Sequence, residues 1–535
     1  MPEPTAPELT APELTALSEL RNLILLTLLG LAACAATPAP RAVPAPPATP
    51  APPATPAPPA ASPSAAGRKL DEALQLVSRH QLEQGLAALA ALIHGPSFGT
   101  LSDDERYRAL AAAGRLESRL ASWEPAYIYL SRAAAMPQAS AEDQLLLLSV
   151  AWHSRSDTRS AQALTDLARR WPKRLVAVDE DYVLRVLFGA TRLPHGVALP
   201  LLQALYDAGW KLKWGIEPST SWRDLALLLL EQGRVSQAIE VSARITDPQV
   251  LIDMRADRRF DALVSARPRR FDVEAAADRQ VDELQAQDGG GANSLRVKAL
   301  LMGALMRQQH YSAALAIADE AVADVRTTNY PERRFVDYLA DYAELLNERA
   351  FALMDLGRWG QALDQLSAAA RLFERGHDNI DGALALAQLD CDLQRPRDAR
   401  SVLGQLTSDL SAYGVMQLES VRLDAAVQLA DSRQVQRSLR YLRAHRDDAT
   451  AAYLRALIVA GQLGPAAREL IRELDDREAR QDALESVQTY LPETATPRDL
   501  ELRARWQSVL ARETVQAAID RVGRIESYHL QGAPF

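Results

Sequence analysis

Aromatic residues, cysteine and, over most of the chain, proline are scarce in this sequence of 535 residues. Aromatic residues make up 6% of the chain, whereas apolar residues make up 48%. This composition argues against β-sandwiches, β-barrels and βαβ proteins, because these folds need β-branched and aromatic runs between regular turn residues. Of the 31 prolines, 16 fall in residues 1–66. The remainder is rich in Ala, Leu and Arg, so we expect an all-α body there.

The sequence also lacks the residue patterns of common active and metal sites. Its two cysteines, Cys34 and Cys391, lie far apart, which excludes a disulfide framework. It contains no His-Glu-x-x-His, Cys-x-x-Cys or Gly-x-Ser-x-Gly motif. We therefore predict no catalytic residue, no metal site and no cofactor, and we interpret Cys391, between two aspartates, as an inert free thiol. The formal net charge of −9 argues against a nucleic-acid partner.

A short apolar run, LILLTLLGLAA, spans residues 23–33 and ends at Cys34. It is shorter than the about 20 residues that a membrane span requires, and its layout is typical of a secretory signal. The final LAAC resembles the lipobox of bacterial lipoproteins, in which the signal is removed and the cysteine is lipidated. This resemblance implies lipid attachment at Cys34 and, because no aspartate follows, delivery to the periplasmic face of the outer membrane. The alternative is that Cys34 is an ordinary small residue of a hydrophobic helix.

The residues on either side of this signal are repetitive. Residues 1–19 contain TAPEL twice and are acidic, unlike the positive start of a secretory signal, so we interpret them as a misassigned start. After Cys34, a Pro/Ala hexad repeat predicts a disordered linker over residues 34–66. At roughly 3.1 Å per residue, residues 35–66 reach at most about 100 Å. The linker is therefore expected to be a tether, with a proline-rich recognition ligand as the alternative.

Helix start signals recur through the body. Four pairs have the spacing of capping boxes or related N-terminal caps: Ser102 with Glu105, Ser140 with Asp143, Ser221 with Asp224, and Thr496 with Asp499. The segments between such signals run roughly 12 to 18 residues, with apolar positions at three- and four-residue spacing. They are too short for coiled coils and too numerous for one bundle.

A second pattern connects pairs of these helices. A turn residue is followed two positions later by an apolar residue and three positions further by an alanine, as in Gly357, Trp359 and Ala362. The corresponding alanines elsewhere are Ala126, Ala238, Ala314 and Ala466. In this pattern the chain resembles tetratricopeptide repeats, in which the glycine turns the hairpin and the alanine allows close helix packing. The resemblance implies an irregular α-α superhelix, a tetratricopeptide-like solenoid, with unclear register around residues 170–215 and 405–450.

A glycine run at residues 289–291 is the strongest break within the body. Neither a preceding strand nor a following Lys-Ser/Thr supports a phosphate-binding loop there. We expect the break to divide an N-terminal helical array, residues 67–287, from a C-terminal array, residues 292–523. Residues 524–535 are expected to be a tail.

Two segments are candidates for partner binding. In the first, an Arg-Arg-Phe-Asp sequence occurs twice and could hold an anionic partner through Arg258, Arg259, Phe260, Arg269, Arg270 and Phe271. The interleaved aspartates also fit a connector between hairpins. The second is the aromatic cluster of Trp210, Trp214 and Trp222, which could stack on sugar rings or peptide side chains, or pack as core.

These features together favour a non-enzymatic interaction scaffold. The resemblance to known lipoproteins of this build suggests that it binds proteins or polysaccharide in envelope assembly or export. The alternative is a helical-toroid carbohydrate-active enzyme acting on envelope glycan, which would need two carboxylates at roughly 5 to 10 Å in one cavity. A closed toroid with such a pair would favour the enzyme, and an open superhelix with a groove would favour the scaffold.

Overall fold

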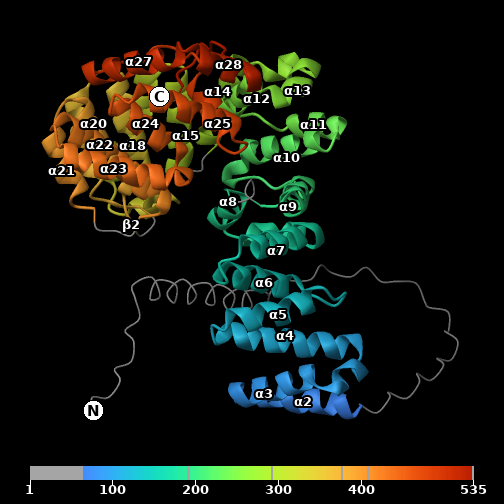
Figure 1. Ribbon diagram of the computed structural model, residues 1–535. Coiled ribbons are helices and arrows are strands. Elements are labelled where there is room, and N and C mark those ends of the chain that lie inside the picture. The colour runs from blue at the N-terminus through green and yellow to red at the C-terminus, as the bar shows by residue number, and fades with distance from the viewer. Residues whose placement is uncertain (1–63, 189–192, 291–292, 375–376, 407–409, 533–535) are drawn as a thin grey trace, which may run out of the picture. The chain divides into compact units, whose positions relative to one another are not determined.

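Helices follow one another along the chain in the computed structural model (Figure 1). The structure describes residues 64–188, 193–290, 293–374, 377–406 and 410–532. Cys34, the signal region and nearly all of the linker lie outside these ranges. The described residues belong to one compact unit, in which five clusters of buried apolar side chains form the core. This confirms the expected all-α superhelix.

The first half of the body consists of helical hairpins, in which helices pack on the next helix or the next but one along the chain. Its helices are α2 (Ala65–Ser78), α3 (Leu82–His94), α4 (Asp103–Arg119), α5 (Trp123–Ala134), α6 (Ala141–His153), α7 (Asp157–Arg170), α8 (Glu180–Phe188), α9 (His195–Asp207), α10 (Ser219–Glu231), α11 (Val235–Ser242), α12 (Pro248–Ala256) and α13 (Asp261–Ala266). Short 3₁₀ helices interrupt the series at η1 (Pro96–Thr100), η2 (Pro172–Ala177), η4 (Lys213–Gly215), η5 (Arg258–Phe260) and η6 (Pro268–Phe271).

The second half continues the same arrangement. Its helices are α14 (Val273–Gly289), α15 (Leu295–Arg307), α16 (Tyr311–Thr327), α17 (Pro331–Arg334), α18 (Tyr338–Asp355), α19 (Trp359–Ala369), α20 (Ile380–Asp392), α21 (Pro396–Leu403), α22 (Ala412–Gln428), α23 (Ser432–Ala444), α24 (Thr450–Val459), α25 (Leu463–Asp475), α26 (Arg480–Ser486), α27 (Pro497–Leu510) and α28 (Glu513–Val522). The 3₁₀ helix η7 (Arg446–Asp448) precedes α24, and two short strands, β1 (Phe373–Glu374) and β2 (His377–Asp378), pair antiparallel before α20.

The hairpin turns have the predicted chemistry. Gly233, Gly357 and Gly461 adopt left-handed backbone conformations, with φ of 72°, 69° and 69°. Glycine meets this demand without the steric penalty of a Cβ atom. The five motif alanines, Ala126, Ala238, Ala314, Ala362 and Ala466, are all completely buried. Their methyl groups therefore lie at the helix contacts, as the repeat pattern predicted.

Three of the four predicted helix starts are confirmed. Ser102 and Thr496 form complete capping boxes with the residues three positions later, and the Ser140 hydroxyl accepts from the Asp143 backbone N–H at 3.1 Å. The prediction at Ser221 is wrong, because α10 already begins at Ser219. The Ser219 hydroxyl instead accepts from the backbone N–H groups of Thr246 and Asp247, at 3.1 and 3.2 Å.

The chain's last helices return to the middle of the body. Helix α26 packs on α12, and Asp257 and Gly523 form an antiparallel bridge. This bridge brings the end of α28 close to the residue that follows α12, and Figure 1 draws the two helices near each other. The part of the chain from α12 to α28 is thus closed on itself. Helix α14 ends within the predicted glycine run, at Gly289, while the division of the body into two arrays stays a prediction.

Candidate functional site

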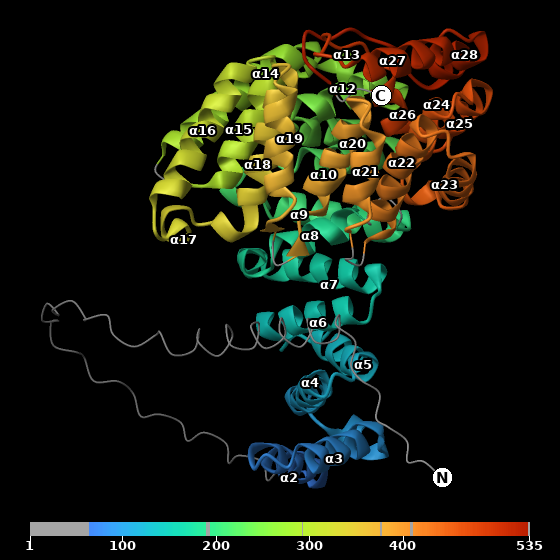
Figure 2. The same cartoon turned by 90° about the vertical axis from the view of Figure 1, so that its left-hand side faces the viewer.

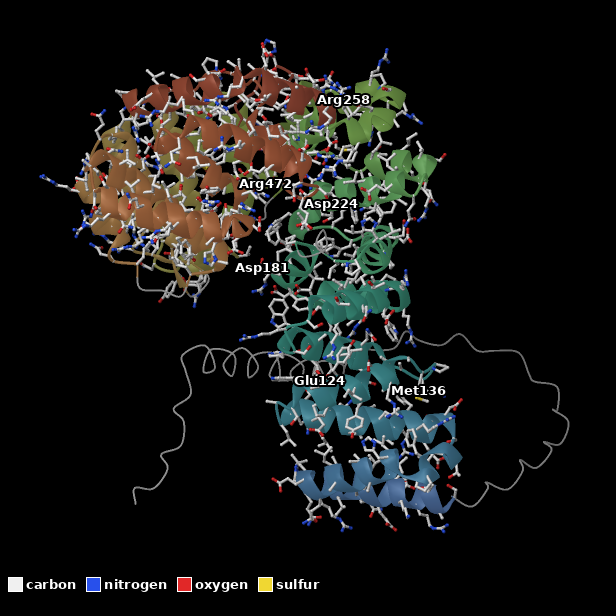
Figure 3. The ribbon with its side chains drawn as sticks, in the orientation of Figure 1. Glu124, Met136, Asp181, Asp224, Arg258 and Arg472 are labelled. Atoms are coloured by element: carbon white, nitrogen blue, oxygen red, sulfur yellow. The ribbon has the colours of Figure 1, made fainter. Side chains whose placement is uncertain are left out.

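The first candidate segment lies where the body closes. Figure 3 shows Arg258 where α13 approaches α28, and its Nε donates to the Asp520 carbonyl at 2.9 Å. The neighbouring Arg255 forms an ion pair of 2.7 Å with Glu526. Because both partners belong to the C-terminal end, these two arginines contribute to closure of the body.

The two phenylalanines of this segment cannot reach a partner. Phe260 and Phe271 are buried in the core, where their large rings gain more by leaving water than they would at the surface. Their expected role as anchors is therefore corrected. Arg259 is held by an ion pair of 2.6 Å with Asp257, whereas Arg269 and Arg270 are exposed. Binding through the exposed arginines stays a prediction.

The tryptophan segment is mostly core. Trp222 is completely buried, and its indole N–H donates to Glu217 at 2.9 Å. The Arg244 guanidinium lies over both Tyr206 and Trp222, 4.7 and 4.8 Å from their ring centroids, and forms an ion pair with Glu217 at 2.8 Å. Burial alone would raise the pKa of Glu217, but hydrogen bonds from Arg244 and Trp222 outweigh it and lower that pKa.

Trp222 is therefore not available as a stacking platform, which corrects that expectation. Trp210 and Trp214 are half-buried, and Trp210 packs against the same core. The cluster as a whole joins α9 to α10 and α11. Partner binding through Trp210 or Trp214 stays a prediction.

The expected C-terminal tail is largely an ordered strap, residues 523–531. It pairs in parallel with residues 489–491: Thr489 N–H donates to the Glu526 carbonyl at 3.0 Å, and Leu491 N–H donates to the Leu530 carbonyl at 2.9 Å. Gln531 N–H also donates to the Arg307 carbonyl at 2.7 Å. The strap thus connects α15 with the segment before α27. Sequence reasoning missed it because its partners lie far away in the chain.

Where α26 packs on α12, two buried acidic groups have raised pKa values. Asp253 on α12 accepts from Arg223 at 3.1 Å and from Gln481 at 2.7 Å. Burial raises the pKa of Asp253 to about 6 despite the Arg223 charge. Burial, together with the charges of Asp253 and Asp482, raises the pKa of Glu485 to about 7. The contact between α12 and α26 is therefore an acidic, buried polar contact.

The end of the strap lies between two further carboxylates. Gln531 Nε2 donates to Asp355 and to Glu493, at 3.2 Å each. Burial raises the pKa of both carboxyl groups. Burial, followed by the charges of these two residues, raises the pKa of the nearby Tyr311 to about 12. Two acids thus share one amide donor from the strap.

A groove crosses the outer face of α7, between α5 and α9. This α7 groove has a volume of about 410 Å³. Its apolar lining includes Tyr127, Leu147 and Val197, while Gln162 and Arg169 supply polar groups. The Arg159 guanidinium lies 4.3 Å from the Tyr127 ring centroid, which fixes one wall. The lining of the groove therefore combines apolar side chains with hydrogen-bonding groups, as binding sites commonly do.

Helix α9 contributes an unusual backbone to the α7 groove. Gly196 and Pro200, both in α9, line it. Proline has no N–H, so the Gly196 carbonyl lacks the donor that an ordinary helix would supply four residues later. The Gly-x-x-x-Pro spacing was the available sequence signal, but nothing in the sequence placed α5 beside it.

A second hollow, of about 510 Å³, lies between α19, α20 and α21. Its lining includes Asp390, Arg395 and Asp398. Arg395 forms ion pairs with both aspartates, at 3.4 and 2.8 Å. One arginine thus pairs with two carboxylates, and Asp390 Oδ1 has no hydrogen-bond partner. The α7 groove exposes more apolar surface, so we take it as the candidate site for a protein partner.

The described residues also bear on the cysteine, on metal ligands and on membrane spans. Cys391 is a free, completely buried thiol, and burial raises its pKa, which confirms the prediction of an inert cysteine. Within the described part of the chain, no group of three or more His, Cys, Asp or Glu side chains is arranged to hold a metal ion. No helix in those ranges is both long and apolar enough to cross a membrane.

No family model and no curated protein match this chain. Among solved structures, yeast Tom70 is 11% identical, with 78% of this chain and 98% of that chain covered, at a TM-score of 0.33. The Cut9–Hcn1 hetero-tetramer of the APC/C is 12% identical, with coverages of 86% and 96% and a TM-score of 0.27. The TPR domain of P58(IPK) is 11% identical, with coverages of 75% and 99% and a TM-score of 0.18. At these scores, the description of the fold rests on this protein's own helices.

Proposed function

We propose that this protein is a non-enzymatic helical scaffold that binds a protein partner through the α7 groove. The observation that carries the proposal is the α7 groove itself, whose lining combines apolar side chains with hydrogen-bonding groups and includes Pro200, which removes one backbone donor from α9. An extended peptide segment offers both apolar side chains and backbone N–H groups. It therefore matches the groove better than a sugar, whose surface is mainly hydroxyl.

Filling the groove tests this proposal. A Cβ atom at Gly196 would meet no other atom within 4 Å, so Gly196→Trp adds a large ring at the groove without a clash at its Cβ. Gly99, which is also free of neighbours within 4 Å, provides the matched control Gly99→Trp. A photo-crosslinker at Gln162 first identifies the bound protein, and titration of that purified partner then measures its affinity. We expect Gly196→Trp to abolish binding and Gly99→Trp to leave it unchanged; equal binding by both variants would contradict the proposal.

We further propose that Cys34 anchors the scaffold in the outer membrane, facing the periplasm, where it serves envelope assembly or export. The lipobox-like sequence before Cys34 supports this location. Two buried acyl chains are enough for stable anchoring, and the Pro/Ala linker would separate the body from the bilayer.

Lipidation at Cys34 is a direct prediction of this location. Metabolic labelling with an alkyne fatty acid should mark the wild-type protein and miss Cys34→Ala. The Cys391→Ala variant controls for the loss of a thiol, because Cys391 is buried in the folded body. Equal labelling of wild type and Cys34→Ala would exclude the anchor while leaving the groove proposal intact.

The closed path from α12 to α28 favours one second candidate, the helical-toroid carbohydrate-active enzyme. Asp355 and Glu493 share Gln531 and could supply the two carboxylates such an enzyme needs. Hydrolysis of purified envelope glycan, lost in both Asp355→Asn and Glu493→Gln, would support the enzyme. The scaffold proposal expects no turnover by the wild-type protein.

A further inference from the structure

Helix α23 carries an arginine row that the proposed function does not use. Arg433, Arg437, Arg440 and Arg443 follow one another at spacings of four, three and three residues. At 100° per residue they fall within an arc of about 120° on one side of the helix. The opposite side is buried through Ser438 and Leu442. The row therefore faces outward, and Figure 2 shows α23 at the outer edge of the helices.

The row is not neutralised within the described chain. All four guanidinium-bearing side chains are exposed, and no described carboxylate lies within 4.0 Å of them. The helix itself, Ser432–Ala444, contains no acidic residue. Two arginines of α22 and α25 are paired, by contrast: Arg422 with Glu419, and Arg472 with Glu469 at 2.7 Å. The whole chain has a net charge of −9. Four exposed arginines without an ion-pair partner in the described ranges are therefore an unusual local concentration of positive charge.

The chemistry of the row restricts what it can bind. Gln436 and Ala444 are the other residues on this arc, so it exposes no large apolar side chain. A helix that enters a bilayer surface needs such side chains, and so does the centre of an interface between folded proteins. The row is suited to a partner held by charge and by paired N–H···O hydrogen bonds from guanidinium to carboxylate.

The spacing of the row matches an acidic polypeptide. At 1.5 Å rise per residue, successive arginines are separated along the axis by about 6, 4.5 and 4.5 Å. A second helix with glutamates at the same spacing presents its carboxylates at the same intervals. Charge rows that face one another between adjacent helices are a known source of pairing specificity.

We propose that the arginine row of α23 is a docking surface for an acidic polypeptide segment that carries carboxylates at four- and three-residue spacing. This surface is separate from the α7 groove. The scaffold would accordingly hold two protein segments, one by shape and one by charge.

A designed peptide tests this docking surface. The probe is a fluorescein-labelled Ala/Gln helical peptide with four glutamates at the spacing of the row, and its control has glutamine at those positions. Fluorescence anisotropy with the full chain should show binding of the probe only, weakened at least tenfold between about 50 and 300 mM salt. Replacing the four arginines by glutamine should weaken binding at least tenfold. Replacing Arg79, Arg119, Arg155 and Arg279, which changes the net charge equally, should change it less than twofold.

A charge-reversal variant distinguishes loss of the docking surface from loss of folding. The Arg437→Glu/Arg440→Glu variant should lose the glutamate peptide and gain a lysine peptide of the same spacing. Unchanged binding by the glutamine variant would overturn the proposal, and so would tighter row-dependent binding of polygalacturonate, oligothymidylate or phosphatidylglycerol vesicles. Gly196→Trp should bind the glutamate peptide normally, so failure of the α7 groove proposal and failure of this one are distinguishable.

Discussion

In the hairpins that contain the five motif alanines, one buried alanine side chain sets how closely two helices approach. Ala362 on α19 is completely buried, whereas Ala368 on the same helix is exposed. We expect Ala362→Leu to lower the free energy of unfolding by about 1 to 3 kcal/mol, because the added carbons have no space. Ala368→Leu should change it by less than about 0.5 kcal/mol. Urea unfolding of the two variants checks the prediction, and equal effects would show that Ala362 is not a close-packing position.

A buried acid makes a second prediction at the scale of one residue. Glu473 on α25 is nearly fully buried, and burial, followed by the charge of Glu469, raises its pKa to about 8. The folded state therefore holds this proton more tightly than the unfolded state, whose value is near 4.5. The stability this proton contributes is present below about pH 4.5 and is lost as the pH rises towards 8.

Replacing Glu473 with glutamine removes this pH dependence. Relative to wild type, Glu473→Gln should gain stability between pH 5 and 8, by at most about 1.4 kcal/mol per pH unit. Glu83→Gln, at an exposed position on α3, is the control and should show no such gain. Urea unfolding at several pH values measures both. A constant difference between Glu473→Gln and wild type would contradict the raised pKa.

The left-handed backbone position recurs in the hairpin turns, yet glycine does not always occupy it. Ala121 and Ala430 hold the left-handed position, with φ of 55° and 57°, that Gly461 holds with φ of 69°. An alanine there costs roughly 1 kcal/mol relative to a favourable residue. We expect Ala430→Gly to raise the unfolding free energy by about 0.5 to 1 kcal/mol and Gly461→Ala to lower it similarly. Thermal unfolding checks this, and a loss of stability in Ala430→Gly would contradict it.

At the scale of the whole molecule, closure depends on one glycine beside α12. A Cβ atom at Gly523 would lie 2.5 Å from both the Ala256 carbonyl oxygen and a Leu484 methyl group. Because the Ala256 oxygen is backbone, the strap must shift to accommodate Gly523→Ala. We expect a loss of about 1 to 3 kcal/mol in unfolding free energy and faster trimming of the C-terminus by carboxypeptidase. Gly289→Ala, where no neighbour lies within 4 Å, should show neither effect.

The Gly523→Ala variant also helps to separate the two candidate functions. Opening the strap removes Gln531 from between Asp355 and Glu493, whereas the α7 groove lies on helices of the first half. Partner binding through the α7 groove should therefore survive Gly523→Ala. Loss of that binding would indicate that closure and recognition are coupled.

The sequence by itself determined the features encoded within a few residues of one another. Helix caps at Ser102 and Thr496, buried alanines such as Ala362, and the inert Cys391 all followed from local spacing and composition. These features are predictable because a helix repeats every 3.6 residues and its ends need nearby partners. The helical fold class was accordingly within reach of the sequence.

Only the tertiary structure decided which faces stay in contact with water. Phe260 and Trp222 looked suitable for binding, but packing between distant helices buries them. Four helices, α5, α6, α7 and α9, assemble the α7 groove, and the bridge from Asp257 to Gly523 joins residues from the middle and the end of the chain. A local pattern shows that a residue is apolar or charged. Which element covers that residue depends on contacts between segments that are far apart in the sequence. No local pattern specifies which segments meet.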